Sequence, residues 1–565
     1  MKKNKLHQAC RTVLRGSAVI SVPIFIALTV ATSGAANAAS INTGNPDLSV
    51  RWDNTLKYSN AFRVKDRSSK ISSGNANGDD GDNNFDKGLV SNRFDILSEV
   101  DIVYKNYGFR MSGAAWYYTV YNKSNDNYSP GTVNHFGRHD KFSNKTRDLH
   151  GRDAELLDLF VTGYWEIGDS SLNVRAGRHA HLWGESLFLG ANGIAGAMAP
   201  VDVVKLTSVP GTQFREAIRP VNQISSEFQL NEYLSFAAYY QFEWEESRLP
   251  GQGSYLASVE LLGKGANMVH AGPLGYFTRD RDVDAKDSGQ GGAAVMFRLP
   301  NSDIDFGLYA IRFHAKSPQT VSNMGVVFGP NPGPPTLTPQ GYRMVYQEDI
   351  DLFGASASTV IGKASVGFEV STRRNTNLVS QTDSAARGSK DRDVYGNAPY
   401  PVGNTAHAQV SWLYSAGPNW LSQEGTFVGE VAWNRVLSVS KNAAMIDSTT
   451  TRDAVGLVVG YTPRYRQVMP GLDLALPVTI AYNPGGKSSA IASFNGGAEN
   501  GGVYSIGVDG TYMGNLNFSL AYTGFIGSAG PGSSANPNDP NTQEFSFKQG
   551  LKDRDFVSFT VNRTF

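Results

Sequence analysis

Hydrophobic and polar residues alternate with a period of two along most of the chain after residue 47. In the stretch 48–64, Trp52, Tyr58 and Phe62 share one face, while polar residues such as Asp53 share the other. Successive side chains of a β-strand point to opposite faces, so this pattern predicts strands with one apolar and one polar surface. The pattern recurs in 235–245, 364–373 and 515–526.

The connections between these segments alternate between short turns and long polar insertions. The insertions are 65–92, 122–153, 179–220, 246–288, 316–343, 376–402, 438–452, 484–501 and 527–551. Bacterial outer-membrane barrels have short periplasmic turns and longer extracellular loops. The sequence therefore predicts an all-β fold, a transmembrane antiparallel β-barrel of about 18 strands, or about 16. A soluble solenoid or a set of sandwiches would not sort connection lengths in this way.

The last ten residues, "FVSFTVNRTF", form a strand pattern that ends on Phe565. In lipid every backbone polar group must be bonded within the protein, so we expect this strand to pair with 48–64 and close the barrel. We expect Phe565 at the periplasmic interface, where it resembles the C-terminal aromatic signal that is read by the barrel assembly machinery. Arg563 stands where such a signal usually has an apolar residue, and near the interface an Arg costs only ~0–1 kcal/mol.

Residues 1–38 have the pattern of a secretory signal peptide. An apolar run, 18–30, precedes small residues at Ala36 and Ala38, and the basic residues of the segment are Lys2, Lys3, Lys5, Arg11 and Arg15. The run is too short for a transmembrane anchor, and Pro23 interrupts it. We expect residues 39–565 to form the mature barrel.

Cleavage would change the composition in two ways. The only cysteine, Cys10, would be lost. The whole chain has 51 basic and 51 acidic residues, and losing five basic residues leaves an acidic excess of five. This balance does not favour nucleic acid as a partner. Because no apolar stretch after the signal reaches about 18 residues, a helical membrane protein is excluded.

The insertion 179–220 is far more apolar than the other long connections. Its apolar side chains should not be exposed to water, so we predict that the segment folds into the barrel, is partly helical, and lines or blocks the pore. The alternative is an extracellular cap packed on its neighbours. The side chains in question are Leu182, Trp183, Leu187, Phe188, Leu189, Ile194, Met198, Val201, Val203, Val204 and Leu206.

Charged residues of both signs fall on the faces predicted to point into the lumen, because a charge facing lipid at mid-depth would cost ~2–4 kcal/mol. We expect most of them to form ion-pair ladders that brace the wall and hold the inserted segment. The mixture of signs does not favour a simple anion- or cation-selective porin. These residues are Arg93, Asp95, Glu99 and Asp101, then Glu227, Glu243 and Glu245, then Glu369 with Arg373, and Glu430, which shares its face with the uncharged Asn434.

Motifs for catalysis and metal binding are weak. No Gly-x-Ser-x-Gly or His-Glu-x-x-His sequence occurs, and His179, His181 and Glu185 alone are a poor metal signature. The loop 75–86 is rich in Asp and Asn, but it lacks the full calcium-loop order, so we interpret it as a solvated loop. We expect no cofactor, no metal and no enzyme activity.

Several stretches resemble an uncharacterised family of Gram-negative outer-membrane β-barrels (domain of unknown function 1302). The most specific is "VRAGRHAHLWGES", 174–186, in which His179 replaces an expected Gln. Others are 91–104, 107–121, 200–220, 239–255, 287–295 and 307–318. The resemblance implies a periplasmic lipid-carrier-like partner, an inner-membrane exporter, and the handling of hydrophobic or amphipathic compounds.

These observations lead to one functional hypothesis and two alternatives. We predict a monomeric outer-membrane channel for a small hydrophobic or amphipathic solute, surrounded by outer-membrane lipids and gated by 179–220. The alternatives are a structural or surface-binding barrel and an outer-membrane lipid hydrolase. The residues predicted to anchor the gate or to face it from the wall are Arg178, Trp183, Glu185, Asp202, Arg215, Glu216, Glu243 and Glu245.

Overall fold

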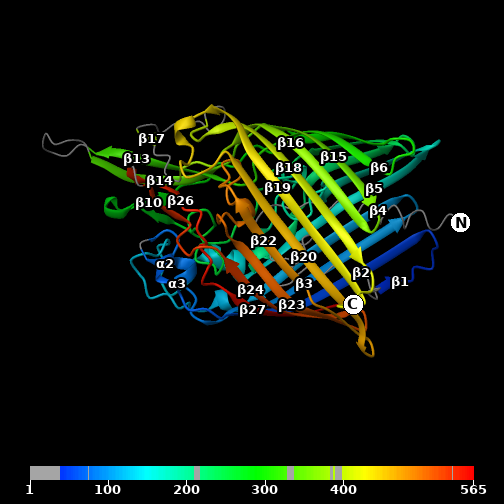
Figure 1. Ribbon diagram of the computed structural model, residues 1–565, viewed down its shortest axis with the longest axis horizontal. Helices are drawn as coiled ribbons and strands as arrows, with labels where there is room; N and C mark the ends of the chain where they lie inside the picture. The colour runs from blue at the N-terminus through cyan, green and yellow to red at the C-terminus, as the bar shows by residue number, and fades with distance from the viewer. Residues whose placement is uncertain are drawn as a thin grey trace.

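The protein is a closed antiparallel β-barrel. The computed structural model describes residues 39–73, 75–208, 217–327, 336–381, 386–387, 398–536 and 539–565. Within these residues 18 strands form the ring, since β21 and β22 share one crossing and β1 is a short addition beside β2. This confirms the larger of the two predicted counts. Figure 1 shows the strands crossing the barrel at a steep tilt.

The ring follows the order of the sequence. Its strands are β2 (Leu48–Arg63), β3 (Gly88–Tyr104), β4 (Tyr107–Tyr118), β5 (Arg152–Ile167), β6 (Ser170–His179), β7 (Val221–Gln229), β8 (Leu234–Gln241), β11 (Gln290–Arg298), β12 (Asp305–Phe313), β15 (Ile350–Ile361), β16 (Ala364–Asn377), β18 (Val402–Ala416), β19 (Glu424–Lys441), β20 (Asp453–Met469), β21 (Leu472–Ala475) with β22 (Val478–Gly485), β23 (Gly502–Tyr512), β24 (Leu516–Ile526) and β27 (Phe556–Thr564).

The barrel closes between its first and last strands, as predicted. β27 pairs antiparallel with β2 over nine residues, from Arg63 opposite Phe556 to Thr55 opposite Thr564. Phe565 continues the ladder, because its backbone N–H and C=O both bond to Asn54 at 2.9 Å. Every strand of the ring therefore has two neighbours. The sheet has no open edge, where backbone N–H and C=O groups would lack hydrogen-bond partners in lipid.

The two faces of the wall differ as the alternation predicts. On β2, Trp52 is 48% exposed on the outer surface, whereas its neighbour Asp53 is 5% exposed on the inner one. β27 repeats the contrast with Phe559 outside at 37% and Thr560 inside at 3%. An outer band of exposed aromatic and aliphatic side chains suits contact with hydrocarbon rather than with water.

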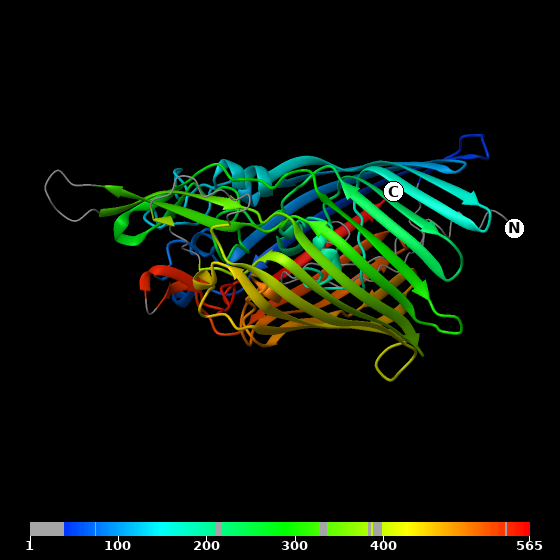
Figure 2. The same ribbon diagram turned by 90° about the horizontal axis from the view of Figure 1, so that it is seen from above.

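Short turns lie at one end of the barrel and long connections at the other. Figures 1 and 2 show β1 (Ala39–Ile41) and the C-terminus at the short-turn end, and the long connections at the opposite end. The order of connection lengths is the one predicted from sequence. Among the residues that the structure describes, no helix is long and apolar enough to cross a membrane.

The long connections carry the remaining elements. A separate five-stranded sheet has the order β17 (Ala386–Arg387), β13 (Gln319–Val327), β14 (Thr336–Val345), β10 (Tyr276–Arg279) and β9 (Met268–His270). A small hairpin pairs β25 (Ser533–Asn536) with β26 (Asp539–Phe545). The helices are α2 (Ser69–Ser72), α3 (Asp80–Asn83), α4 (Asn144–Thr146) and α5 (Val203–Ser208), with short turns η2 (Val120–Asn122), η3 (Arg147–Gly151), η4 (Ile194–Ala197), η5 (Gly272–Leu274), η6 (Ala443–Met445) and η7 (Phe494–Gly496).

Candidate functional site

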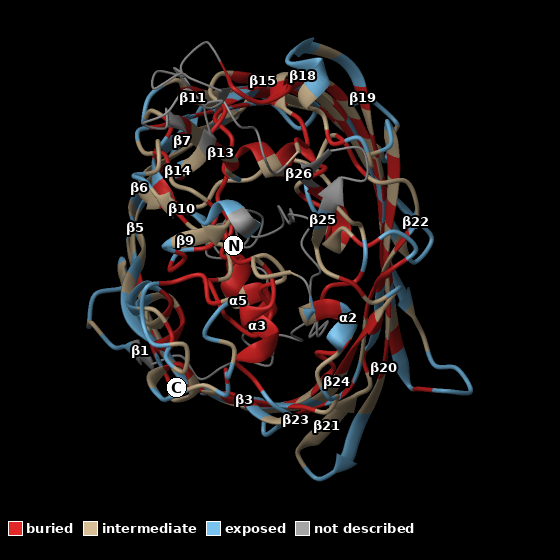
Figure 3. Ribbon diagram, turned by 90° about the vertical axis from the view of Figure 1, so that its left-hand side faces the viewer, coloured by how far each residue is buried: buried red, intermediate tan, exposed pale blue. Residues whose placement is uncertain are grey.

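Residues 180–208 and 217–220, the described parts of the connection between β6 and β7, lie inside the ring, and we call them the plug segment. They include η4 and α5, so the predicted partial helicity is confirmed. The segment reaches as far as β19, which lies across the ring beyond β7, β8, β11, β12, β15, β16 and β18. Figure 3, which looks onto the long-loop end, shows α5 within the ring of strands.

Glu430 of β19 holds the far end of the plug segment. Its carboxylate is fully buried and accepts four hydrogen bonds from consecutive residues. The Ser186 hydroxyl donates at 2.8 Å, and the backbone N–H groups of Leu187 and Leu189 donate at 3.1 and 2.8 Å, with that of Phe188 between them. Hydrogen bonds to a charged acceptor are about twice as strong as neutral ones, so this carboxylate fixes a whole turn of backbone.

Glu369 of β16 provides a second attachment. Its carboxylate, also buried, accepts the backbone N–H of Glu185 at 2.8 Å and that of Ile194. The carbonyl of Glu185 in turn accepts the Ser411 hydroxyl of β18 at 2.7 Å. Glu185 is thus attached through its backbone, and its side chain has no ion pair among the described residues.

Between these points the wall binds the plug segment at residues 191–193. Arg373 of β16 donates to the carbonyls of Ala191 and Gly193 at 2.7 and 2.9 Å. The fully buried Asn192 donates to the carbonyl of Trp433 at 3.2 Å, and its side-chain oxygen lies 3.1 Å from Nδ1 of His407. The predicted ion pairing is therefore wrong for Glu369, Arg373 and Glu430. Their side chains instead form hydrogen bonds with backbone groups of the plug segment.

Aromatic packing fixes the near part of the plug segment. Trp183 is buried with its ring 5.1 Å from that of Tyr239 and 5.8 Å from that of Tyr309, and its backbone N–H points to Sδ of Met198 at 3.1 Å. The inner faces of β8, β11, β12 and β15 complete this cluster with Ala237, Ala294, Ile311, Phe313 and Leu352. The contact between segment and wall is apolar here.

An ion-pair cluster lies at the rim of the barrel, where the plug segment leaves β6 and returns to β7. Arg178, near the end of β6, bonds Glu243 at 2.8 Å and Glu245 at 2.9 Å, and Glu245 also bonds Arg219 on the returning chain at 2.5 Å. Glu243 and Glu245 were expected to face the lumen from a strand. The strand is shorter than predicted, because β8 ends at Gln241, and both carboxylates lie at the rim beside the two arginines.

Asp202 belongs to a second ion-pair cluster. It bonds Arg248 at 2.6 Å, and Arg248 and Lys205 both bond Glu155 of β5 at 2.7 Å. α5 is thereby joined to the barrel wall and to the connection 242–289. Of the other predicted residues, Arg215 and Glu216 lie outside the described residues.

The predicted residues are therefore distributed over several places rather than gathered at one. Trp183 packs on Tyr239 of β8 and Tyr309 of β12, and Glu185 is attached to β16 and β18, whereas Arg178, Glu243 and Glu245 meet at the rim. Glu369 and Glu430 were recognised as inward-facing charges but not as the principal attachments of the segment. A buried charge at an inward position without a cross-strand partner of opposite sign was the signal that could have identified them.

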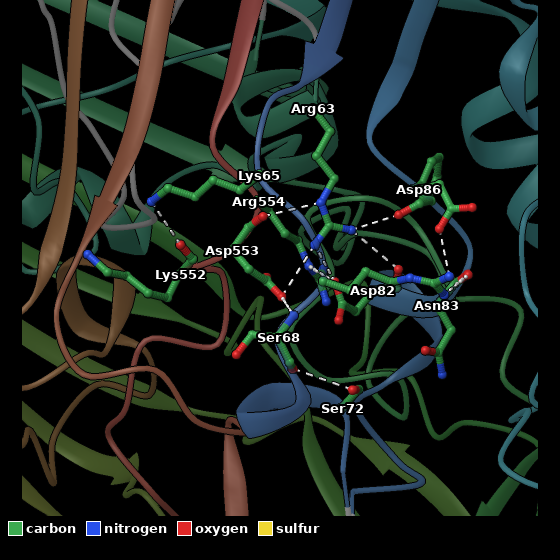
Figure 4. Close-up of polar contacts among 12 residues, drawn as sticks. Arg63, Lys65, Ser68, Ser72, Asp82, Asn83, Asp86, Lys552, Asp553 and Arg554 are labelled. Carbon is green, nitrogen blue, oxygen red and sulfur yellow. Dashed lines mark hydrogen bonds and ion pairs between the residues drawn. The ribbon is translucent and has the colours of Figure 1, made fainter.

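Above the plug segment, the long connections meet in a buried polar cluster, which Figure 4 shows. Arg63 at the end of β2 bonds Asp82 of α3 at 2.7 Å and donates to the carbonyl of Phe85 at 2.7 Å. Arg554, just before β27, donates to the carbonyls of Tyr255 and Ala257 at 2.6 and 2.7 Å. These contacts tie four distant stretches of the chain together over the lumen.

The Asp-rich loop 75–86 is part of this mouth. Its interpretation as a solvated loop is wrong, because Asp79, Asp80 and Asp82 are all buried. Asp80 accepts the backbone N–H of Asn134 at 2.9 Å, and burial raises the pKa of its carboxyl to about 7. Burial and the nearby Asp80 raise the pKa of Glu260 to about 8. In the described chain no group of three or more His, Cys, Asp or Glu is arranged to hold a metal.

A Ser–His pair bears on the hydrolase alternative. Nε2 of His179 lies 2.9 Å from Oγ of Ser225, and its Nδ1 lies 3.0 Å from the carbonyl of Gly177. The third partner is therefore a backbone carbonyl rather than a carboxylate, and both side chains are buried in the inner wall. Hydrolases of the triad type use an acidic or amide side chain to orient the histidine.

The fold and the segment across its lumen define a plugged β-barrel of the membrane-spanning class. The chain belongs to the family described as "Protein of unknown function (DUF1302)", whose model matches residues 20–565. No curated protein sequence matches the chain.

Solved structures of outer-membrane proteins share the barrel with this chain at low similarity. OpdK from Pseudomonas aeruginosa is 11% identical, with 91% of this chain and 98% of that chain covered and a TM-score of 0.40. OccAB1 from Acinetobacter baumannii is 8% identical, with 94% and 98% covered and a TM-score of 0.42. At these values the likeness carries no information about the solute.

Proposed function

We propose that the protein is an outer-membrane channel for small hydrophobic or amphipathic compounds, with the plug segment as its gate. The observation that carries this proposal is the way the plug segment lies against the wall. It is bound to β16 and β19 by hydrogen bonds and to β8, β11, β12 and β15 by apolar side chains. A displaced segment would leave an apolar surface on one side of the lumen, which a hydrophobic solute could follow.

The attachments suit a gate because they can be broken and remade. Hydrogen bonds between buried side chains of the wall and backbone groups of the segment stabilise its observed position without a covalent link. When the segment moves, water or solute polar groups can take the place of the lost partners. The cluster of Arg178, Glu245 and Arg219 would keep both ends of the segment in place during such a movement, and the cluster at Asp202 would hold α5.

Deleting residues 182–206 tests the gate. We expect the deletion to raise single-channel conductance in planar bilayers and to speed uptake of a small apolar fluorophore into proteoliposomes. The control deletion removes 326–337 from the β13–β14 hairpin, which belongs to the separate five-stranded sheet. Unchanged conductance in the first deletion, with the barrel folded, would contradict the gate.

The buried mouth favours one alternative, a structural or surface-binding barrel. Arg63, Asp82 and Arg554 have fully buried side chains in the cluster that covers the lumen. If this cover never opens, the barrel will pass no solute, whether residues 182–206 are present or deleted. Native mass spectrometry of gently extracted protein separates the two functions, because a channel should retain a hydrophobic compound that a purely structural barrel lacks.

A further inference from the structure

Lys316 is a buried cation without a counterion. It lies three residues beyond β12, at the long-loop end of the wall, and is 6% exposed. Its ammonium donates one hydrogen bond, to Oε1 of Gln290 at 3.1 Å. Among the described residues no carboxylate forms an ion pair with it, and burial lowers the pKa of Lys316 to about 7. An ammonium group has three N–H donors, so the site holds unused donor capacity.

Gln290 adds a second donor at the same place. This first residue of β11 is fully buried on the inner face of the wall. Its Oε1 accepts both from Lys316 and from the backbone N–H of His314 at 3.3 Å, which fixes the orientation of the amide. Nε2 then faces away from these donors and has no partner among the described residues. The site therefore offers N–H donors and lacks an acceptor.

Apolar side chains and the plug segment adjoin these donors. Phe313 and Ala315, on either side of His314, belong to the buried cluster that includes Met198 and Trp183. Gln290 pairs in register with Gln241 of β8, whose amide donates to the carbonyl of Met198 at 2.5 Å. The unused donors thus lie beside the apolar contact between wall and gate.

We propose that Lys316 and Gln290 form a binding site for an amphipathic monocarboxylic acid. The carboxylate would accept from the Lys316 ammonium and the Gln290 amide, and the apolar tail would lie along Phe313 towards Met198. A carboxylate supplies the acceptors and the negative charge that the site lacks, whereas an alcohol supplies an acceptor without the charge. This inference rests on the proposed channel function and names the class of solute.

Binding of octanoate, octan-1-ol and octylammonium to the full-length protein in a non-ionic detergent tests the site. We expect octanoate to raise the melting temperature most and octylammonium least. Lys316→Met should weaken octanoate binding at least about tenfold, since it removes a charged hydrogen bond. Gln290→Glu should also abolish octanoate binding, because it gives Lys316 a permanent counterion, and it should raise the melting temperature of the unliganded barrel.

Lys363→Met, an exposed lysine in a turn at the other end of the barrel, is the matched control and should bind octanoate as the parent protein does. Equal binding of octanoate and octan-1-ol, or undiminished octanoate binding by Lys316→Met and Gln290→Glu, would overturn the proposal. If the 182–206 deletion still raises conductance in that case, the channel function stands and only the class of solute is wrong.

Discussion

At the scale of single residues, Asp80 and Glu260 couple the mouth of the barrel to pH. Both are fully buried in the long connections, and the carboxylate of Glu260 accepts the backbone N–H groups of Gly81, at 2.8 Å, and of Gly253. Their pKa values are raised to about 7 and about 8 by burial. An acid that binds its proton more tightly when folded stabilises the fold at low pH, and this contribution is lost as pH rises through the raised pKa.

Asp80→Asn should remove part of that pH dependence. In the parent protein we expect the stability of the mouth to fall between about pH 4 and pH 8 and then to level off. The variant cannot lose a proton at this position, so it should be more stable than the parent at pH 8.5, by on the order of 2 kcal/mol, and the difference should shrink near pH 4.5. Hydrogen exchange of residues 75–86 measures the effect, and parallel pH profiles of the two proteins would contradict it.

At the scale of elements, the plug segment is held where its short helical pieces leave the backbone unpaired. η4 and α5 contain four and six residues, too few to satisfy their own backbone groups by helical hydrogen bonds. Side chains of the barrel wall supply the missing partners. The wall strands are bonded to neighbours on both sides, so in the proposed gate we expect the segment to move and the wall to stay in place.

Glu430→Gln should loosen the far end of the plug segment. The substituted amide has one acceptor oxygen and turns two N–H donors towards the donors of residues 186–189. Hydrogen bonds to a charged group contribute about 1.5–3 kcal/mol each, so we expect hydrogen exchange at 187–189 to accelerate by roughly tenfold or more. Glu227→Gln is the control, because Glu227 also starts from an inward position on β7 but has no hydrogen bond or ion pair to the described residues of the plug segment. Equal exchange in both variants would argue against Glu430 as an attachment.

At the scale of the whole molecule, closure of the ring depends on the backbone of the last strand. β27 and Phe565 complete the ladder with β2, while the Phe565 side chain remains 49% exposed on the outer side. The side chain therefore contributes little to the packing of the finished barrel.

Phe565→Ala should separate folding from assembly. After refolding in detergent, the variant should migrate differently on an electrophoresis gel before and after boiling, as the parent protein should. The reason is that the backbone ladder between β2 and β27 is intact. In cells we expect less of it in the outer membrane, since the terminal aromatic is predicted to be read by the barrel assembly machinery. Loss of the folded form in detergent would show that the side chain is needed for closure itself.

The period-two alternation was enough to predict the wall. β2 and β27 were predicted to pair because a sheet in lipid cannot leave an edge without hydrogen bonds. The alternation of apolar and polar residues in each strand indicates which of its faces points to lipid. The sorting of connections by length was likewise visible along the chain. The inward fold of 179–220 followed from its composition, since Trp183, Phe188 and Ile194 needed a buried place.

The identity of the contacts was decided by the tertiary structure. Glu430 meets residues 186–189 across a separation in sequence of more than 240 positions, and Lys316 meets Gln290 only because β11 and β12 lie side by side. The loop 75–86 looked solvated because its polar partners, near residues 252 and 554, are distant in the chain. Local alternation sets the direction of a side chain, but the partner that satisfies a buried charge depends on which strands the closed ring places opposite one another.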